Sequence, residues 1–249
     1  MKIALATLCI GEYEKGAHVL FSTLEKYGGL PDSVDRYAVG IDECEYATAI
    51  PLKNDYSWIP VNQQHFPTVA GKFQALNLQY DRIILLDSDM LCVGDCSLLW
   101  SNYLGKLPFY AVRDVASNVY YHGVIESIGL NHNLLFNAGT MVFSMNLLGD
   151  DFHNCLLEEI CDGVCSSYDG GDQGYLNHYF QLHKTEIGFL PMEYNVCADP
   201  HWPKLDVELT RLVHFTGSNA NPWSPNVGNN DPRQPLFQRW QHEYERLQR

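Results

Sequence analysis

Short runs of consecutive apolar residues alternate with longer stretches of helical periodicity along this chain. The clearest run, RIILL from Arg82 to Leu86, is followed directly by Asp87, Ser88 and Asp89. An uninterrupted apolar run predicts a strand covered on both faces, as in a parallel α/β sheet. Ligands of such sheets collect at the carboxyl ends of the strands, so the two acids stand where a functional site is expected.

The same alternation predicts the other elements. Before this strand, the pattern indicates strands at 2–7 and 35–41 and helices at 15–28 and 69–80, with Gly28 closing the first helix. After it, the pattern indicates a helix at 171–183 and strands at 108–114, 137–145, 189–195 and 211–217. The fold class is therefore α/β, with a Rossmann-like, mostly parallel central sheet flanked by helices.

The C-terminal stretch 235–248 predicts a last helix. Leu236, Trp240, Tyr244 and Leu247 share one face of it, so it is expected to pack on the body of the protein. A loop rich in Pro, Asn and Gly at 219–235 precedes it, and no repeat or low-complexity linker divides the chain. We therefore expect one domain over residues 1–249.

Composition narrows the classes of partner. With 46% apolar residues, the 249-residue chain can bury a substantial core. A formal charge of -14 argues against a nucleic-acid partner, because binding to a phosphate backbone needs clustered Lys and Arg. The start MKIALATLC lacks the apolar segment of a signal peptide, and no apolar run predicts a transmembrane segment.

The 8 cysteines are scattered through the chain, and a chain of this size folds without disulfides. We interpret them as reduced thiols, and together with the absence of an Asn-X-Ser/Thr sequon they predict a cytoplasmic protein. Cys155, Cys161 and Cys165 lie close in sequence, but no fourth ligand stands at zinc-finger spacing, so burial is the preferred explanation for them.

Asp87 and Asp89, two positions apart at a strand end, can direct both carboxylates at one point. Oxygen ligands select a hard cation such as Mg²⁺ or Mn²⁺, which completes its shell with substrate phosphates. Two acids at a strand end are also common in turns and caps. Taken alone, the triplet leaves both interpretations open.

Four further segments accompany LLDSDML: FNAGTMVFS at 136–144, DGGDQGYLNHYF at 169–180, LPMEYN at 190–195 and HFTGSNANPW at 214–223. In this order and spacing they resemble the family 8 retaining glycosyltransferases, most closely the glycogenin-like members, from about Ala4 to Trp223. The resemblance implies a single-domain GT-A fold. It would comprise a nucleotide-binding half at about 1–100, a sugar and acceptor half at about 101–223, and a C-terminal loop and helix at 224–249.

The resemblance also implies roles for individual residues. Asp87, Asp89 and His214 would bind Mn²⁺, or Mg²⁺, at the diphosphate of a UDP-sugar. The candidate catalytic residues, near the anomeric carbon, are Asp172, Gln173 and Asp169. The candidate substrate-binding residues are Thr7, Leu8, Tyr13, Lys72, Ser88, Asn137, Ala138, Gly217 and Asn221. The structural alternatives are a core histidine for His214, helix capping by Asp169 or Asp172, packing of Tyr13 and a solvated Lys72.

The segment HFTGSNANPW at 214–223 departs from the family pattern H-F-x-G-x-x-K-P-W. It is one residue longer, and Asn221 stands before Pro222 in place of the lysine that reaches the diphosphate. An amide donates hydrogen bonds but carries no charge, so the metal ion and Lys72 are left to stabilise the departing UDP.

The resemblance implies a metal-dependent retaining hexosyltransferase that moves a hexose or related sugar from a UDP-sugar to an acceptor, which we expect to be a separate sugar, polyol or glycan. One alternative is glycogenin-like self-glucosylation, which is less favoured because no tyrosine stands between Asn195 and His214. Another is a weakly active nucleotide-sugar-binding protein, which the missing lysine suggests. A haloacid-dehalogenase-like phosphatase is a third alternative. It is disfavoured because such proteins carry Thr or Val at the position that Leu91 occupies here. The sequence does not determine five properties: the donor sugar, the acceptor, the linkage formed, the route to retention and whether the protein forms a homodimer.

Overall fold

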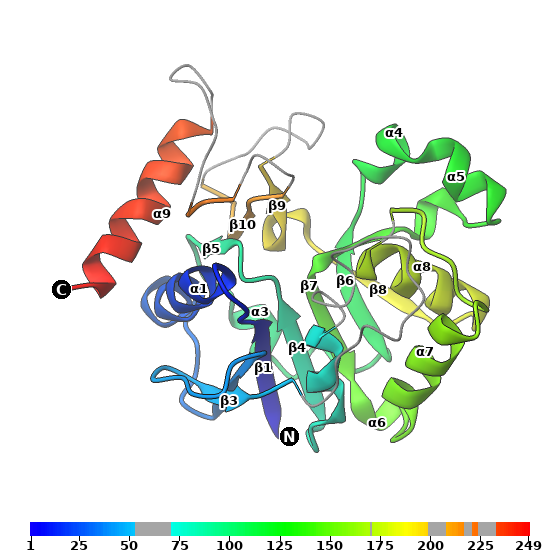
Figure 1. Cartoon of the computed structure of the whole chain (residues 1–249), viewed down its shortest axis with the longest axis horizontal. Helices are drawn as coiled ribbons and strands as arrows, with labels where there is room; N and C mark the ends of the chain where they lie inside the picture. Colours follow the sequence, from blue (N-terminus) through cyan, green and yellow to red (C-terminus); the bar gives the residue numbers. More distant parts are fainter. Residues whose placement is uncertain (53–70, 170, 199–207, 217–220, 224–232) are drawn as a thin grey trace.

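A seven-stranded sheet of order β3-β2-β1-β4-β7-β6-β8 forms the centre of the protein (Figure 1). The structure is a computed structural model that describes residues 1–52, 71–169, 171–198, 208–216, 221–223 and 233–249. The strands of this sheet are β1 Ile3–Leu8, β2 Val34–Val39, β3 Thr48–Ile50, β4 Arg82–Leu86, β6 Phe109–Arg113, β7 Phe136–Ser144 and β8 Ile187–Leu190. β7 runs antiparallel to β4 and β6, whereas the other pairs are parallel, so the predicted mostly parallel sheet is confirmed.

Helices cover both faces of this sheet. In Figure 1, α1 and α9 lie to the left of the sheet and α7 and α8 to its right. The α-helices are α1 Tyr13–Tyr27, α3 Ser97–Trp100, α4 Ser117–Tyr120, α5 His122–Ser127, α6 Met145–Leu148, α7 Phe152–Cys161, α8 Asp172–Leu182 and α9 Gln234–Leu247. The 3-10 helices are η2 Gly71–Asn77, η3 His132–Leu134 and η4 Met192–Tyr194.

The alternation of side chains along β4 explains its unbroken apolar run. Ile83 and Leu85 pack into a core with α7 and α8, whereas Ile84 and Leu86 pack into a second core with α1 and α3. Successive residues of a strand point to opposite faces, so a strand buried on both faces needs apolar residues throughout. The run ends at Asp87 because that residue has left the sheet and faces the site described below.

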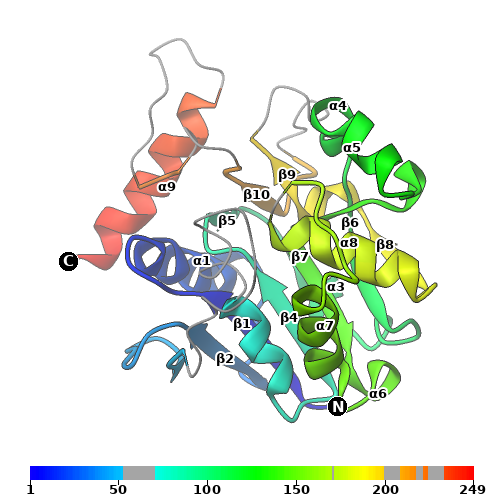
Figure 2. The same cartoon turned by 45° about the vertical axis from the view of Figure 1, so that its right-hand side comes forward.

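A small second sheet lies beyond the carboxyl end of β4. It has the order β5-β10-β9, with β5 Met90–Cys92, β9 Val196–Cys197 and β10 Leu212–His214. β10 pairs antiparallel with β5, and this register places His214 opposite Met90. Figure 2 shows α4 and α5 at the same end of the molecule as the small sheet, away from the N-terminus.

Most predicted elements are observed, with two differences. The strand expected at 189–195 is wrong in its second half, because Pro191 ends β8 and η4 follows. The helix expected at 69–80 is a 3-10 helix over Gly71–Asn77 in its described part. Gly28 closes α1 as predicted, since its N–H donates to the carbonyl of Leu24. The start of the 69–80 segment, most of the 219–235 loop and Gly217 lie outside the described residues.

The C-terminal helix packs as expected. Trp240 is buried, and Leu236, Tyr244 and Leu247 are partly buried in the same cluster. The 8 cysteines are free, as predicted. Within the described part of the chain, no helix combines the length and the apolar character that crossing a bilayer requires.

Candidate active site

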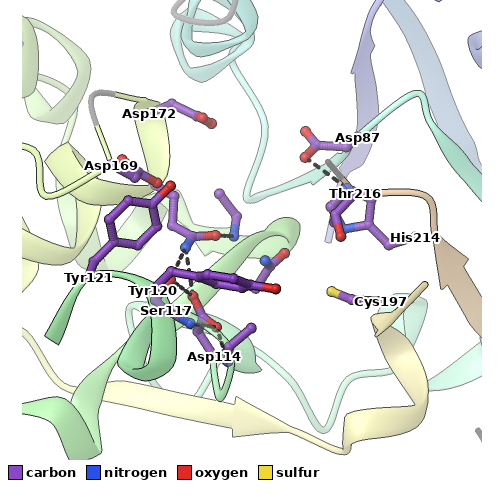
Figure 3. A pocket seen from close by; sticks show the side chains of 14 residues that line it. Asp87, Asp114, Ser117, Tyr120, Tyr121, Asp169, Asp172, Cys197, His214 and Thr216 are labelled. Atoms are coloured by element: carbon purple, nitrogen blue, oxygen red, sulfur yellow. Dashed lines mark hydrogen bonds and ion pairs between the residues drawn. The ribbon is translucent and has the colours of Figure 1, made fainter. Parts of the chain in front are cut away.

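A cavity of about 330 Å³ opens at the carboxyl end of β4, between β7, the start of α8 and the small sheet (Figure 3). The side chains that line it come from both halves of the chain. Seven residues predicted from the sequence line it: Asp87, Asn137, Ala138, Asp169, Asp172, Gln173 and His214. The antiparallel direction of β7 brings Asn137, near its start, to the edge where β4 ends.

The predicted metal ligands converge beside this cavity. Asp87 and Asp89 lie in the loop between β4 and β5, and His214 ends β10. The Nε2 atom of His214 lies 3.5 Å from Asp87 Oδ2 and 3.2 Å from Asp89 Oδ1. One possible ligand atom from each of the three residues lies within 4.8 Å of the others. Two carboxylates and an imidazole form an incomplete shell that suits a divalent cation with open positions for a ligand.

Residues behind His214 fix the orientation of its ring. Nδ1 lies 2.9 Å from Asn195 Oδ1, and Asn195 Nδ2 donates to Asn137 Oδ1 at 2.6 Å. An amide oxygen accepts the Nδ1 proton, which directs Nε2 at the two acids. A Cβ on Gly139 would lie 2.4 Å from Nδ1, so the ring packs where only glycine leaves room. These residues fit a metal site, and the two asparagines act as its supporting shell.

The charge state of His214 also reflects these acids. Burial by itself lowers the pKa of the imidazole, but the Asp89 carboxylate and the Cys197 side chain together outweigh burial and raise the pKa well above its usual value. The core-histidine alternative describes its burial but not its position, because Nε2 faces two carboxylates and not an apolar core.

Lys72, in η2, is buried with only 4% of its surface exposed. Its Nζ lies 2.7 Å from Asp87 Oδ1 and also pairs with the carboxylate of Asp172 at the start of α8. Burial lowers the pKa of Lys72, but the carboxylates of Asp172 and Asp87 outweigh it and raise the pKa above its ordinary value. The solvated alternative for Lys72 is therefore excluded, and its ammonium connects the metal edge to α8.

Gln173 is immobilised by hydrogen bonds from both ends of its amide. Its Oε1 accepts from the N–H of Ala138 at 3.1 Å, and its Nε2 donates to Asp114 Oδ2 at 2.6 Å and to Ser117 Oγ at 3.1 Å. Asp114 in turn accepts from the N–H groups of Ala116 and Ser117. The sequence analysis missed Asp114 and Ser117, although Asp114 was visible as an acid at the end of a predicted strand.

Asp169 has a structural task in addition to its place in the cavity. Its Oδ1 accepts from Ser167 Oγ at 2.8 Å and from the N–H groups of Gly171 and Gly174 at 2.9 and 3.1 Å. Burial raises the pKa of Asp169, and these donors partly offset the rise. Asp169 therefore satisfies the N–H of Gly174 in the first turn of α8, although Gly171 and not Asp169 is the N-cap residue.

Three of the candidate substrate-binding residues lie at the end of β1 and the start of α1: Thr7, Leu8 and Tyr13. Thr7 is buried, and its Oγ1 has no hydrogen-bond partner among the described residues. The side chain of Leu8 is buried. The Tyr13 ring meets Trp223 edge to face at 5.2 Å, and burial, followed by Asp89 and Asp87, raises the pKa of Tyr13. Tyr13 therefore lies near the metal ligands.

Seven other predicted site residues do not line the cavity: Thr7, Leu8, Tyr13, Lys72, Ser88, Asp89 and Asn221. Ser88 is buried in the loop between the two acids, and Asn221 is half-buried.

Two tyrosines that the sequence analysis did not single out form the opposite wall. Tyr120 ends α4 and Tyr121 follows it, and they are 52% and 37% exposed. Figure 3 shows both rings across the cavity from Asp87 and His214. They lie within the stretch at about 101–223 that was predicted to hold the sugar and the acceptor. Cys197 and Thr216 complete the lining on the side of the small sheet.

The family model of glycosyl transferase family 8 matches residues 71–226, more than half of the chain. The chain therefore belongs to this family, as the sequence motifs predict.

Three curated relatives illustrate the range of similar proteins. A glycogenin from Neurospora crassa is 26% identical over 230 residues, which cover 85% of this chain and 30% of that protein. A lipopolysaccharide 1,2-glucosyltransferase from Escherichia coli is 29% identical over 61% of this chain and 46% of that protein. Galactinol synthase 6 from Arabidopsis thaliana is 24% identical over 59% of this chain and 47% of that protein. The matched part spans less than half of each of these relatives.

Solved structures share the fold over nearly the whole chain. The galactosyltransferase LgtC, crystallised with donor and acceptor sugar analogs, gives a TM-score of 0.70 at 17% identity and covers 98% of this chain and 95% of that chain. Mouse xyloside xylosyltransferase 1 gives a TM-score of 0.59 at 13% identity, with 88% and 99% covered. The predicted GT-A fold is thus confirmed, and sugar transfer is the activity of the family.

Proposed function

We propose that this protein is a metal-dependent retaining glycosyltransferase that transfers a hexose or related sugar from a UDP-sugar to a separate carbohydrate or polyol. The convergence of Asp87, Asp89 and His214 at the edge of the cavity carries this proposal. Relatives named as a glucosyltransferase and a galactinol synthase support a hexose donor. The 8 free thiols support a cytoplasmic location.

The three ligands would hold Mn²⁺ or Mg²⁺ with Asn195 and Gly139 keeping the imidazole in place. A divalent cation at this position supplies positive charge where the leaving diphosphate becomes more negative. Lys72 contributes in another way: it offsets the charges of Asp87 and Asp172, so that both acids face the cavity without uncompensated repulsion.

The residues near the reacting carbon support same-face departure as the route to retention. In that route, the bond from the anomeric carbon to the phosphate breaks, the acceptor oxygen bonds to the same face, and the acceptor proton moves to the leaving phosphate. The Asp172 carboxylate is paired with Lys72, and Gln173 is a neutral amide fixed by Asp114. Neither side chain is an unpaired carboxylate of the kind that forms a covalent intermediate efficiently.

The tyrosine wall supports a carbohydrate acceptor. Aromatic rings offer apolar faces with a polar hydroxyl at one end, and binding sites commonly combine such faces with a few placed polar groups. Tyr120 and Tyr121 supply the faces, and Asp114 and Asp169 lie beside them in the cavity. We place the acceptor between these rings and the sugar of the donor.

Calorimetric titration with UDP, in Mn²⁺ and in EDTA, tests the metal assignment. The Asp89→Asn variant should weaken binding in Mn²⁺ by more than the roughly 10–100-fold typical of supporting residues. Asp32→Asn, which removes an exposed acid far from the cavity, serves as the matched control and should bind UDP normally. Equal affinity for UDP in EDTA and in Mn²⁺ would contradict the proposal.

A second measurement distinguishes an enzyme from a binding protein. UDP release from UDP-glucose and UDP-galactose is followed with and without sugar, polyol and glycan acceptors, and the donor is ranked by its thermal stabilisation of the protein in Mn²⁺. Acceptor-dependent release supports transfer. Tight donor binding with no release under any condition favours a nucleotide-sugar-binding protein.

A further inference from the structure

A second cluster of metal-binding side chains lies outside the cavity. His122 and Glu126 stand one helical turn apart in α5, and His132 begins η3. The Nε2 atoms of His122 and His132 lie 3.6 Å and 4.0 Å from the same atom, Glu126 Oε1. One donor atom from each of the three residues lies within 4.8 Å of the others. None of the three lines the cavity or belongs to the Asp87, Asp89 and His214 site.

We propose that His122, Glu126 and His132 bind a zinc-class transition-metal ion. In a tetrahedral site with metal–ligand distances of about 2.0–2.2 Å, donor atoms lie about 3.3–3.6 Å apart. The distance of 3.6 Å from His122 to Glu126 falls within this range, and the distance of 4.0 Å from His132 exceeds it by a few tenths of an ångström, which side-chain rotation accommodates. His122 and Glu126 are 62% and 61% exposed, so the remaining position of the ion opens to solvent.

The types of ligand atom determine which metal ion this cluster binds. Two imidazoles and one carboxylate suit Zn²⁺, Co²⁺ or Ni²⁺, whereas Mg²⁺ and Ca²⁺ prefer oxygen ligands. The Asp87, Asp89 and His214 site has the opposite balance, with two carboxylates and one imidazole. The two clusters therefore differ in the donor atoms that they offer, and the second is the richer in imidazole nitrogen.

An ion pair between exposed side chains explains this arrangement less well than a bound metal ion does. Ion pairs between exposed side chains contribute little to stability, so Glu126 gains little from a second histidine. The two imidazole rings also meet edge to face with centroids 4.7 Å apart, and both converge on the same carboxylate. A single ion bound by all three side chains accounts for this convergence, whereas a pair between one histidine and Glu126 does not.

The cluster connects two parts of the chain that are supported differently. The η3 segment is attached to the body, because the N–H of Asn131 donates to Gln181 Oε1 of α8 at 2.7 Å and the guanidinium of Arg113 donates to the carbonyl of Asn133. α5 follows α4 and Tyr121, and it packs on the body through the buried side chain of Ile125, which contacts the cluster of Leu135 and Tyr168. An ion held by all three ligands ties α5 to the attached segment and thereby steadies the tyrosine wall. This last consequence rests on the proposed function, whereas binding of the ion does not.

Titration of the intact protein with Zn²⁺, in the presence of saturating Mn²⁺, tests the proposal. We expect one saturable Zn²⁺ site and a tetrahedral Co²⁺ absorption spectrum when Co²⁺ is the probe. His122→Ala and His132→Ala should each weaken Zn²⁺ binding by at least about tenfold, because each removes a direct ligand. His183→Ala is the matched control, since His183 pairs with Glu159 at 2.8 Å on another surface, and it should bind Zn²⁺ normally.

The Asp89→Asn variant separates this site from the proposed active site. It should lose metal-dependent UDP binding and keep the Zn²⁺ site, so failure of one assignment does not affect the other. Circular dichroism of the zinc-free variants verifies that they are folded. Zn²⁺ affinity that is unchanged in both His122→Ala and His132→Ala, or the absence of saturable binding to the wild-type protein, would overturn the proposal.

Discussion

The Nζ atom of Lys72 lies 2.7 Å from Asp87 Oδ1, which makes a buried ammonium the direct neighbour of the first acid of the DSD segment. The same ammonium pairs with Asp172 on the other side of the cavity. One cation thus offsets two acids that are far apart in the sequence, next to a third acid, Asp89. Because Asn221 stands where the family pattern has a lysine, this pairing gives Lys72 a central part in the charge balance of the site.

Replacing Lys72 by Met should therefore reduce both activity and stability. Removal of one partner from a buried ion pair typically costs about 3–5 kcal/mol, because the remaining charges are left uncompensated. We expect a loss of about 3 kcal/mol in the free energy of unfolding, measured with urea, and a fall of at least about 100-fold in UDP release. Lys15→Met, which breaks an exposed pair with Glu12, should change neither quantity appreciably. Wild-type activity in Lys72→Met would show that the ammonium is dispensable.

Gly139→Ala should disturb the metal site mainly through the ring of His214, with Asn137 Oδ1 as a further close neighbour at 3.0 Å. The added Cβ would lie 2.4 Å from Nδ1 and 2.5 Å from Cε1 of that ring, so the ring must move away from its position facing the acids. We expect metal-dependent UDP binding to fall at least about tenfold. Gly123→Ala is the control, since a Cβ there meets nothing within 4 Å. The assignment of Gly139 would fail if both variants bound UDP with equal affinity in calorimetry.

Asn221→Lys restores the charge of the family pattern. If the new side chain reaches the diphosphate, a charge-assisted hydrogen bond should tighten UDP binding by on the order of 1 kcal/mol. Asn146→Lys adds the same charge at an exposed position remote from the cavity, and it measures the general effect of a more positive chain. Calorimetry at two salt concentrations distinguishes the two effects. A UDP affinity no higher than that of the control would mean that the longer segment 214–223 directs the side chain at position 221 away from the phosphates.

Glu243 attaches the C-terminal helix to α1 and predicts a pH dependence of stability. It is 2% exposed and accepts hydrogen bonds from Lys26, Tyr27 and Arg246. Burial raises the pKa of Glu243, but these three donors outweigh it and lower the pKa to about 2. A pKa that is lower in the folded state stabilises the protein above the unfolded pKa of about 4.3, and this contribution is lost as the pH falls toward 2.

Glu243→Gln should accordingly lower the free energy of unfolding by about 2 kcal/mol at pH 7. The difference from the wild-type protein should shrink as the pH falls from about 5 toward 2, because the wild-type carboxylate then becomes protonated. Urea denaturation at several pH values measures both effects. Glu12→Gln, which alters an exposed pair on α1, should show little difference at any pH. A constant difference between pH 7 and pH 3 would contradict the assigned pKa.

The pattern of apolar runs located β4 and the acids after it because local burial on both faces determines that pattern. It did not show the direction of β7, since a buried strand has the same composition whichever way it runs. In a parallel strand, Asn137 would have stood at the opposite edge from Asp87. The antiparallel direction instead places Asn137 beside Asp87, and the family motif was the only signal for it in the sequence.

The supporting residues were harder to predict because long-range contacts define them. Asn195 orients His214 across 19 positions, and Gln173 is held by Asp114 across 59 positions. Nothing local to either residue predicts its partner. Gly139 was quoted within a motif, but its close approach to the imidazole follows from the packing of β7 on the small sheet and not from its neighbours in the sequence.

The last prediction concerns whether the protein modifies itself. The segment 196–213 contains no tyrosine, so the acceptor of a glycogenin-like reaction is missing from it. Trp202 stands about where that tyrosine would fall, and it belongs to residues 199–207, which lie outside the described part. Tyr120 and Tyr121, however, place two phenol groups in the cavity. We expect their rings to bind a separate acceptor, and we therefore expect no mass increase when the protein is incubated with Mn²⁺ and each common UDP-sugar and then weighed intact.

Two substitutions at Tyr120 distinguish a ring that binds from a hydroxyl that reacts. Tyr120→Phe keeps the apolar face and should retain transfer to a separate acceptor, whereas Tyr120→Ala removes the face and should raise the acceptor KM with little effect on UDP binding. Val119→Ala, an exposed neighbour that does not line the cavity, is the control. A ladder of hexose additions in the wild-type protein that disappears in Tyr120→Phe would establish self-glycosylation instead, because only the hydroxyl can attack the anomeric carbon.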